Sequence, residues 1–436
     1  MLSLSVWLGD SPTATTAPWT ASKANFRPGL YQKSTIPGLK LAFSLPGNKI
    51  HYVETDPTAS RIGEDMSPID RRLITHANWS LIGFTALLFL VGVANLYSAS
   101  GSRLSEGLEV ASYYQRQFVW GAMGVGIMAV VMSLDYRHLK NFDSIIYLAS
   151  IILLVMVLGM GKSAKGAARW LHFGGFTIQP SELAKISVLI MGAKLLSATR
   201  EPLGWRRLFL VLLMGLIPAG LIFKQPDLGT CLLVLLLLGG MILYKGVRAD
   251  VLKACFIALP AMLPVGWFFL KPYQKQRLMT FWNPTSDPLH SSYHINQSHI
   301  AIGSGQIWGK GFLEGTQNQL RFLPEKHTDF AISVFGEEWG FVGCVLLLSV
   351  FCFFLMSILN TARDAKDRFG SILAAGVFFY FFWQILINMG MTMGLLPVVG
   401  IPLPFISYGG NATLVNFCLL GLVLNVSMRR FVFKVS

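Results

Sequence analysis

The stretch KPYQKQRLMTFWNPTSDPLHSSYHINQSHIAIGSGQIWGKGFLEGTQNQLRFLPEKHTDF, residues 271–330, decides how the rest of this sequence is interpreted. It is the only long polar interruption in a chain that is almost continuously apolar after residue 78. It contains four of the eight histidines, a cluster of basic residues, and acids set among Pro, Gly and Trp. Polar loops between apolar segments commonly carry function, so we expect the chemistry of the protein in this stretch.

The composition around this stretch is that of a membrane protein. The chain has 436 residues, of which 53% are hydrophobic and 13% charged, and its mean hydropathy is +0.53. A soluble domain carries about 25% charged residues. The apolar blocks are long enough to cross a bilayer, which needs about 20 residues per helix. We therefore predict an all-α polytopic membrane protein. The net charge of +14 does not require a nucleic-acid partner, because loops on the cytoplasmic side are normally basic.

The apolar blocks predict about ten transmembrane helices. They lie at residues 79–98, 117–134, 144–161, 182–197, 207–223, 228–245, 251–270, 331–359, 372–394 and 404–428. Every alternate connection is basic, which predicts that both termini are cytoplasmic and that the 271–330 loop is extracytoplasmic, between helices 7 and 8. Residues 1–65 are polar and have no apolar run of signal-peptide length. We expect them to be a disordered extension or the product of an upstream start codon, and residues 66–436 to form the transmembrane domain.

Two of the outer loops are also basic, against the usual charge bias. The residues concerned are Lys162, Lys165 and Arg169 in GKSAKGAARWLHFGG, and Lys271, Lys275, Arg277, Lys310, Arg321 and Lys326 in the long loop. Such side chains can extend toward lipid phosphates. Their clustering in two loops favours instead a binding site for an anionic, phosphorylated substrate. His327 and Asp329 supply only two potential metal ligands, so whether a metal is bound stays unknown.

Ionisable residues also interrupt the apolar blocks. Glu182 and Lys185 are three residues apart, so they share one helix face and form either a structural pair or the lining of a polar cavity. Asp227 in KQPDLGT fits a helix N-cap. Glu337 and Glu338 in FGEEWG fit charge pairing at a helix end, and Gln384 and Asn388 fit interhelical hydrogen bonding.

Asp287 is the strongest catalytic candidate. Pro284 and Pro288 restrict the backbone on either side of it in FWNPTSDPLHSSYH. A carboxylate held in this way can act as a general base toward a sugar hydroxyl, although an Asx-turn before proline would give the same pattern.

The last outer loop, GLLPVVGIPLPFISYGGNAT at residues 394–413, leads into the final block through several Pro and Gly residues. Such an interrupted entry is tolerated where protein or water covers the backbone, so it lines a cavity or forms a simple kink. The residues expected to shape it are Pro404, Ser407, Gly409 and Gly410.

These motifs together resemble the SEDS family (shape, elongation, division and sporulation), which includes RodA, FtsW and SpoVE. The resemblance rests on KGAARWLHFGGFTIQPSELAK, KQPDLGT, the 281–343 stretch and GLLPVVGIPLPFISYGG, and it covers nearly all of residues 71–430. PVVGIPLPFISYGG and GTQNQLRFLPEKHTDF are more similar to the RodA branch than to the FtsW branch. One departure is Asn411-Ala412 after SYGG, where relatives usually carry Ser-Ser.

The resemblance implies a peptidoglycan glycosyltransferase of the bacterial cytoplasmic membrane that serves cell elongation and rod shape. It would polymerise lipid II, a disaccharide-pentapeptide on undecaprenyl pyrophosphate, beside a class B penicillin-binding protein. Asp287 matches the proposed catalytic residue of the family. The outer cations, with His327, would bind the pyrophosphate, and Glu182 and Lys185 would line the cavity beneath. The sequence does not decide whether a divalent cation such as Mg²⁺ or Mn²⁺ takes part.

Two other functions share the membrane fold. A lipid II flippase would need an inward-facing polar route and no catalytic Asp outside. A noncatalytic scaffold for a penicillin-binding protein would need helix-packing surfaces but neither Asp287 nor the outer basic cluster. The outer position of the charge favours the enzyme.

Overall fold

A computed structural model describes residues 76–104, 113–160, 162–164, 167–173, 176–282, 293–320, 322 and 326–431. Several residues named above fall outside this range: the 1–65 extension, Lys165, Arg321, and the catalytic candidate Asp287 with its flanking Pro284 and Pro288. The loop residues Lys162, Lys271 and Lys326 fall inside them.

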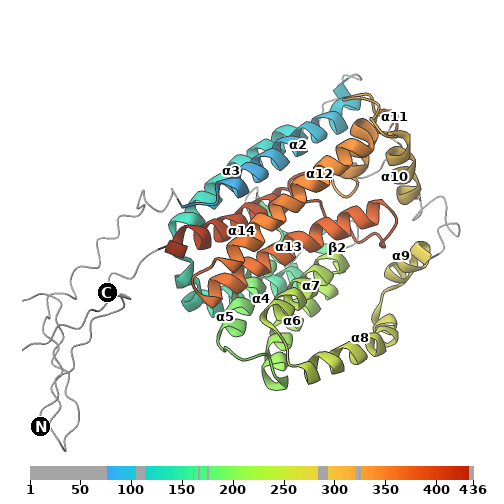
Figure 1. The fold of residues 1–436 in the computed structure, drawn as a ribbon. Coiled ribbons are helices and arrows are strands. Elements are labelled where there is room, and N and C mark those ends of the chain that lie inside the picture. The colour runs from blue at the N-terminus through green and yellow to red at the C-terminus, as the bar shows by residue number, and fades with distance from the viewer. Residues whose placement is uncertain are drawn as a thin grey trace, which may run out of the picture. The chain divides into compact units, whose positions relative to one another are not determined.

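The described residues contain ten helices of at least 18 residues, which confirms the predicted all-α polytopic architecture (Figure 1). A helix satisfies its own backbone hydrogen bonds, which a membrane requires. Eight of the ten are long and apolar enough to span a bilayer. The ten are α2 (Trp79–Leu104), α3 (Tyr113–Ser133), α4 (Leu139–Met160), α5 (Pro180–Ser197), α6 (Trp205–Lys224), α7 (Leu228–Lys245), α8 (Ala249–Phe269), α12 (Ala331–Arg363), α13 (Arg368–Thr392) and α14 (Gly410–Met428).

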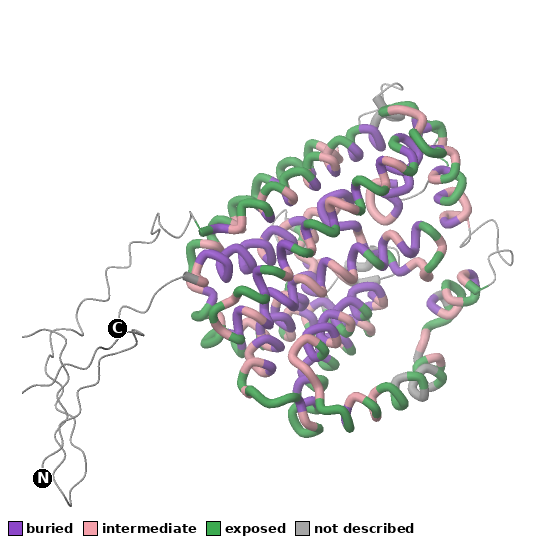
Figure 2. The backbone as a smooth tube through the Cα atoms, viewed as in Figure 1, coloured by how far each residue is buried: buried purple, intermediate pink, exposed green. Residues whose placement is uncertain are grey.

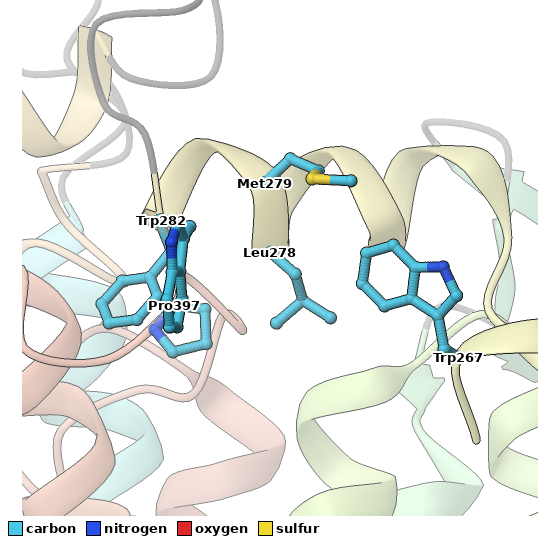
Figure 3. A pocket seen from close by; sticks show the side chains of 6 residues that line it. Trp267, Leu278, Met279, Trp282 and Pro397 are labelled. Atoms are coloured by element: carbon cyan, nitrogen blue, oxygen red, sulfur yellow. The ribbon is translucent and has the colours of Figure 1, made fainter. Parts of the chain in front are cut away.

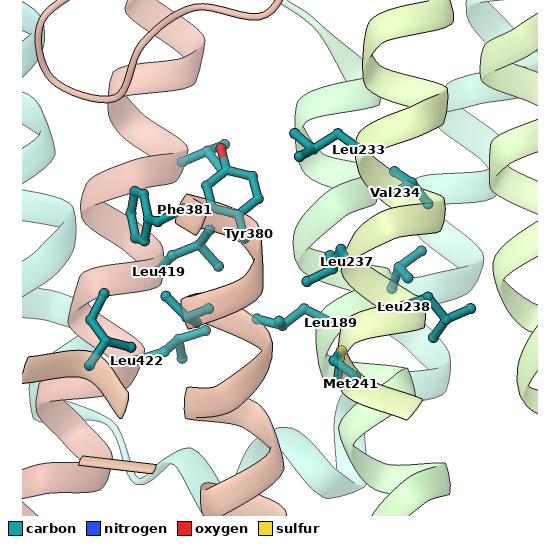
Figure 4. Packing of buried hydrophobic residues seen from close by; sticks show 14 of the residues in the cluster. Leu189, Leu233, Val234, Leu237, Leu238, Met241, Tyr380, Phe381, Leu419 and Leu422 are labelled. Carbon is teal, nitrogen blue, oxygen red and sulfur yellow. The ribbon is translucent and has the colours of Figure 1, made fainter. Parts of the chain in front are cut away.

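The helices pack around α13 and α14, which are the most buried of the candidate spans. α14 packs on α3, and α13 packs on α12, α7 and α5. Figure 4 shows Leu189 of α5 and Leu237 of α7 facing Tyr380 of α13. In contrast, α8 runs along the edge of the bundle in Figures 1 and 2, and its side chains are largely exposed.

Two connections that were predicted as loops contain regular structure. The 271–330 loop holds three short helices, α9 (Pro272–Trp282), α10 (Tyr293–Ser304) and α11 (Thr316–Gln319). The connection before α5 folds into a three-stranded antiparallel sheet of order β1-β2-β3, made of β1 (Lys162–Ala164), β2 (Ala167–Phe173) and β3 (Phe176–Ile178). Single-turn 3-10 helices η2 (Tyr136–His138) and η3 (Arg429–Phe431) follow α3 and α14.

The predicted start of the last helix at residue 404 is wrong, because α14 begins at Gly410. Phe405 has a φ of +64°, in the left-handed region, so the helix cannot extend through it. A turn forms instead: the backbone N–H of Leu403 donates to Ser407 Oγ at 2.9 Å, and the N–H of Ser407 donates to the Leu403 carbonyl at 3.0 Å. The entry to α14 is therefore an irregular loop, residues 397–409, packed inside the protein.

α12 is interrupted at Gly340, which has φ +64° and ψ −164°. The connection after α10, residues 305–311, takes over the helical hydrogen bonds that this interruption removes. Lys310 N donates to the Glu337 carbonyl and Gly311 N to the Glu338 carbonyl, at 3.0 and 3.1 Å. In return, the N–H groups at positions 341 and 342 donate to the carbonyls of residues 306 and 307, at 2.9 and 3.1 Å. The loop is therefore joined to the helix by backbone bonds on both sides of the interruption.

Candidate functional site

A buried ion pair begins the site at the first turn of α5. Lys185 Nζ donates to Glu182 Oε1 at 2.7 Å, and the side chains are only 2% and 9% exposed. The ammonium also lies 5.2 Å from the centre of the Tyr380 ring. Tyr380 donates to Asn416 Oδ1 at 2.9 Å, so the pair is connected through α13 to α14. The helical spacing of Glu182 and Lys185 predicted their pairing correctly.

Asp227 forms the second part of the site and confirms its predicted role as the N-cap of α7. Its carboxylate accepts from Thr230 N at 3.3 Å and from Thr230 Oγ1 at 3.0 Å. Gln179, the residue before α5, donates from Nε2 to Asp227 Oδ2 at 3.5 Å. One carboxylate thus holds the first turns of α5 and α7 together.

The small sheet carries Arg169 to the same place. Arg169 Nη1 lies 4.0 Å from Asp227 Oδ1, and Arg169 Nε donates to the Gln225 carbonyl at 3.4 Å. Its Nη2 donates to the Pro226 carbonyl. The side chain is 35% exposed, so it is bound to this turn and still partly accessible.

The 397–409 loop lies between the elements of the site. Asn388 of α13 donates to the Ile401 carbonyl at 2.8 Å and to the Asp329 carbonyl at 3.0 Å, so it binds two loops and not a neighbouring helix. Gly229 of α7 is so close to this loop that a Cβ there would lie 2.5 Å from the Val399 carbonyl oxygen.

Pro404, Gly409 and Gly410, which were predicted to shape the entry to the last helix, lie at the end of this loop or directly after it. Gly409 N donates to Gln117 Oε1 at 3.4 Å, and Gln117 Nε2 donates to Thr413 Oγ1 at 3.0 Å. Pro404 is buried, and a Cβ on Gly410 would lie 2.5 Å from the Trp120 ring. Polar side chains of α3 and α14 therefore fix the irregular backbone.

His327 meets the same loop from the other side. Its ring stacks on Tyr113 with centroids 4.3 Å apart, and its carbonyl accepts from Tyr408 N at 2.8 Å. The adjacent Lys326 is only 8% exposed and donates from Nζ to the Asn318 carbonyl at 2.8 Å. Lys326 therefore contacts the α11 segment, whereas His327 contacts the 397–409 loop.

Of the two cations of α9, Arg277 is exposed and contacts the 397–409 loop, whereas Lys275 is half-buried against α8. Arg277 Nη1 donates to the Val398 carbonyl at 3.2 Å, and Lys275 Nζ lies 5.8 Å from the centre of the Trp267 ring. Lys271 is exposed just before the helix. A cavity of about 380 Å³ opens beside these cations (Figure 3). Its lining is apolar and consists of Trp267, Leu278, Met279, Phe281, Trp282 and Pro397.

The structure therefore brings most of the predicted residues to one end of the bundle, which we call the site end. Arg169, Glu182, Lys185 and Asp227 form or adjoin one network, and Arg277, His327 and Ser407 are joined by the 397–409 loop. Glu338 belongs to a different cluster: it accepts from Ser98 Oγ near the Gly340 interruption. Glu337 and Glu338 are both buried near the N-terminal end of α12, and Glu337 pairs with Lys310 at 2.7 Å, which confirms the charge pairing expected for Glu337.

Sequence reasoning missed several polar residues of this site. Tyr113, Gln117, Gln179, Tyr380 and Asn416 all bind the charged or irregular elements described above. The available signal was polarity within or next to an apolar helix, which marks a buried polar contact.

Glu182 Oε2 and Gln384 Oε1 are buried and have no hydrogen-bond partner within the described part of the chain.

An all-α bundle with a buried ion pair, a charged helix cap and an exposed cationic helix at one end defines a polytopic membrane protein with a polar site at that end. The profile of the FtsW/RodA/SpoVE family, described as "Cell cycle protein", matches residues 78–431. The chain belongs to this family.

Individual relatives agree with the family assignment. The chain is 39% identical to the peptidoglycan glycosyltransferase MrdB of Escherichia coli (strain K12) over 354 residues, which cover 81% of this chain and 95% of MrdB. It is 32% identical to the peptidoglycan glycosyltransferase RodA of Treponema pallidum, with coverages of 79% and 96%.

Solved structures show the same fold. A chain from a peptidoglycan synthase complex, in a study of how polymerization and crosslinking are coordinated, has a TM-score of 0.70 and 30% identity. The similarity covers 82% of this chain and 99% of that chain. The rod shape determining protein RodA of Thermus thermophilus has a TM-score of 0.61 and 28% identity, with coverages of 81% and 98%.

Proposed function

We propose that this protein is a peptidoglycan glycosyltransferase that polymerises lipid II into glycan strands for cell elongation. The observation that carries the proposal is the 39% identity, over almost the full length of MrdB, to a chain named for that activity. The charged network at the site end supplies the second support, because it retains polar groups that a membrane bundle would otherwise exclude.

In the proposed reaction, Asp287 is the general base. It takes the proton from the C4 hydroxyl of the acceptor GlcNAc, and the oxygen attacks the anomeric carbon of the donor sugar. The new glycosidic bond forms on the face opposite the leaving group, which inverts the linkage from α to β. The bond to undecaprenyl pyrophosphate breaks, and the pyrophosphate leaves with the bonding electrons.

The exposed cations are assigned to that leaving group. Lys271 lies just before α9, and the half-buried Lys275 and the exposed Arg277 lie on it; all three precede Asp287 in the sequence. Arg169, which is 35% exposed, lies at the Asp227 turn. Arg can bind two phosphate oxygens at once, and cations placed before the reaction stabilise charge as it develops. We assign Lys165 to the same task on the resemblance alone.

The buried groups have a different proposed role. Lys185 is already neutralised by Glu182, so we assign this pair to the floor of the cavity and to fixing α5 against α13. The contact of Lys326 with the Asn318 carbonyl indicates that it positions the loop that leads to His327. Within the described residues, no three His, Cys, Asp or Glu side chains lie close enough together to hold a metal ion.

The proposed setting is the bacterial cytoplasmic membrane, with both termini in the cytoplasm and the site end outside. Basic residues at the opposite end support this orientation, since cytoplasmic loops are enriched in Lys and Arg. Arg363, Arg368, Arg429 and Arg430 lie at that end. The similarity to a chain of a peptidoglycan synthase complex supports a class B penicillin-binding protein as partner.

The decisive experiment is polymerisation of purified lipid II by wild type and by Asp287→Asn, each with and without the cognate penicillin-binding protein. A β-lactam would block the transpeptidase of that partner. We expect polymer from wild type only. Polymer from both would place the base elsewhere, whereas lipid II movement between leaflets without polymer would identify a flippase. Partner binding with no polymer from either protein would identify a scaffold.

A further inference from the structure

The segment 304–313, which starts at the last residue of α10, exposes several large apolar side chains although it lies in a polar stretch of the sequence. Ile307 is 59% exposed and Trp308 is 80% exposed. Phe341 of α12, next to the interruption at Gly340, is 65% exposed. Large exposed apolar patches mark contacts with another protein or with a membrane.

Two helices give the depth of this segment in the membrane. At the basic end, Asn78 donates to the Ser357 carbonyl at 3.3 Å and to Thr361 Oγ1 at 3.1 Å. At the site end, Ser98 of α2 donates to Glu338 of α12. About 20 residues separate these two levels on either helix, which at 1.5 Å per residue is about 30 Å.

This distance equals the thickness of the hydrocarbon core of a bilayer, about 30 Å. The first level coincides with basic residues, since Arg363 ends α12 two residues after Thr361 and Arg429 follows α14. The second level therefore lies at the other boundary between hydrocarbon and headgroups. The 304–313 segment is bonded to α12 at this level, through the carbonyls of Glu337 and Glu338.

The attachment is rigid in three ways. Four backbone hydrogen bonds join residues 306–311 to α12 across the Gly340 interruption. Lys310 Nζ donates at 2.7 Å to Glu337 Oε1, which is completely buried. A Cβ on Gly305, Gly309 or Gly340 would overlap the facing backbone, so only glycine permits this approach. The height of the segment is consequently fixed by α12.

We propose that the 304–313 segment is an interfacial anchor that places Trp308 and Ile307 in the headgroup region of the leaflet at the site end. The segment is bonded to α12 at Phe341, and Phe341, Val345 and Leu346 of that helix are also exposed. Trp is favoured at this depth, because its ring is apolar and its N–H is polar. The anchor would hold α10 and α11 at a fixed height above the lipid. This proposal does not depend on the proposed reaction.

The test uses the full-length protein alone in lipid nanodiscs. The emission of Trp308 is obtained as the difference between wild type and Trp308→Phe. Quenchers are lipids brominated near the glycerol, lipids brominated near the methyl end, and iodide in the water. We expect the shallow bromine to remove the larger share of the Trp308 emission. Trp383→Phe is the matched control, because the Trp383 indole nitrogen is buried within the bundle and should respond little to shallow bromine or iodide.

Quenching of Trp308 by iodide and not by either lipid would overturn the anchor. If addition of the penicillin-binding protein then removed the iodide quenching, the surface would be a protein-docking site instead. A second variant tests the attachment: Gly340→Ala should release the segment and increase iodide quenching of Trp308. Gly303→Ala, where a Cβ meets nothing within 4 Å, should leave it unchanged. A folded Gly340→Ala protein with wild-type quenching would show that the interruption does not position Trp308.

Discussion

Charged residues at the site end form ion pairs with their neighbours, and Glu182 is the clearest case. Glu182→Gln leaves the Lys185 ammonium buried without a counter-charge, which we expect to destabilise the protein by about 3–5 kcal/mol. Adding Lys185→Met should restore most of that stability, because no buried charge remains. Denaturation of the purified protein in detergent measures both effects.

The exposed pair Arg248–Asp250 provides the control for this prediction, since both side chains are more than half exposed. Arg248→Ala should cost about 1 kcal/mol or less. A double variant as unstable as Glu182→Gln would show that the two residues contribute through packing and not through charge.

Arg277 allows a separate prediction about turnover. Arg277→Ala removes a cation from the exposed face of α9, and we expect polymerisation to fall about 10- to 100-fold while folding is retained. Arg277→Lys should keep more activity, because it preserves the charge but not the two-point geometry. Initial rates with purified lipid II measure the difference. Wild-type rates in Arg277→Ala would remove this residue from the proposed pyrophosphate site.

At the scale of elements, the contact between α7 and the 397–409 loop is the critical one. Gly229→Ala places a methyl group 2.5 Å from the Val399 carbonyl oxygen, so the loop has to move. We expect a destabilisation of about 1–3 kcal/mol and a loss of polymerisation. Gly239→Ala in the same helix meets nothing within 4 Å and serves as the control. Equal activity of the two variants would show that the loop position is not needed for the reaction.

The elements also show where sequence reasoning succeeded and where it failed. α7 lies at residues 228–245 as predicted, because Asp227 caps it and Gly246 ends it. The sheet before α5 and the helices α9, α10 and α11 were not predicted, since short polar segments have no strong apolar period. The interruption of α12 was hidden for a related reason: Gly340 is stable in its conformation only because residues 305–311, distant in sequence, supply its hydrogen bonds.

For the whole molecule, the apolar blocks were sufficient to predict an all-α polytopic membrane bundle, because the bilayer sets the length and composition of each helix. About ten transmembrane helices were predicted, and eight helices of the described residues are long and apolar enough to span a membrane. The site was partly predictable: the spacing of Glu182 and Lys185 and the cap at Asp227 are local patterns. The roles of Tyr380, Asn416 and Gln117 depend on which helices become neighbours. No local pattern in one sequence contains that information.

The N-terminal extension gives the prediction at this scale. The family profile begins at residue 78, well after the 1–65 segment. We expect a protein that starts at Met66 to insert, fold and polymerise lipid II like the full chain. Thermal denaturation and polymerisation rates of the two proteins measure this. Loss of membrane insertion in the shorter protein would assign the extension a role in biogenesis.

The buried charges of α5 also have a consequence for biosynthesis. Glu182 and Lys185 are buried in its first two turns, whereas Lys194, in its last turn, is 40% exposed. A charged residue opposes membrane insertion, by about 2.5–3.5 kcal/mol where it lies at the centre of a helix. In the folded protein, α5 is covered by α4, α7 and α13, two of which are synthesised after it. A nascent chain that ends after α5 therefore lacks α7 and α13, two of the helices that cover α5 in the folded protein. The helix would enter the lipid late, together with its later neighbours, so the order of insertion would differ from the order of translation.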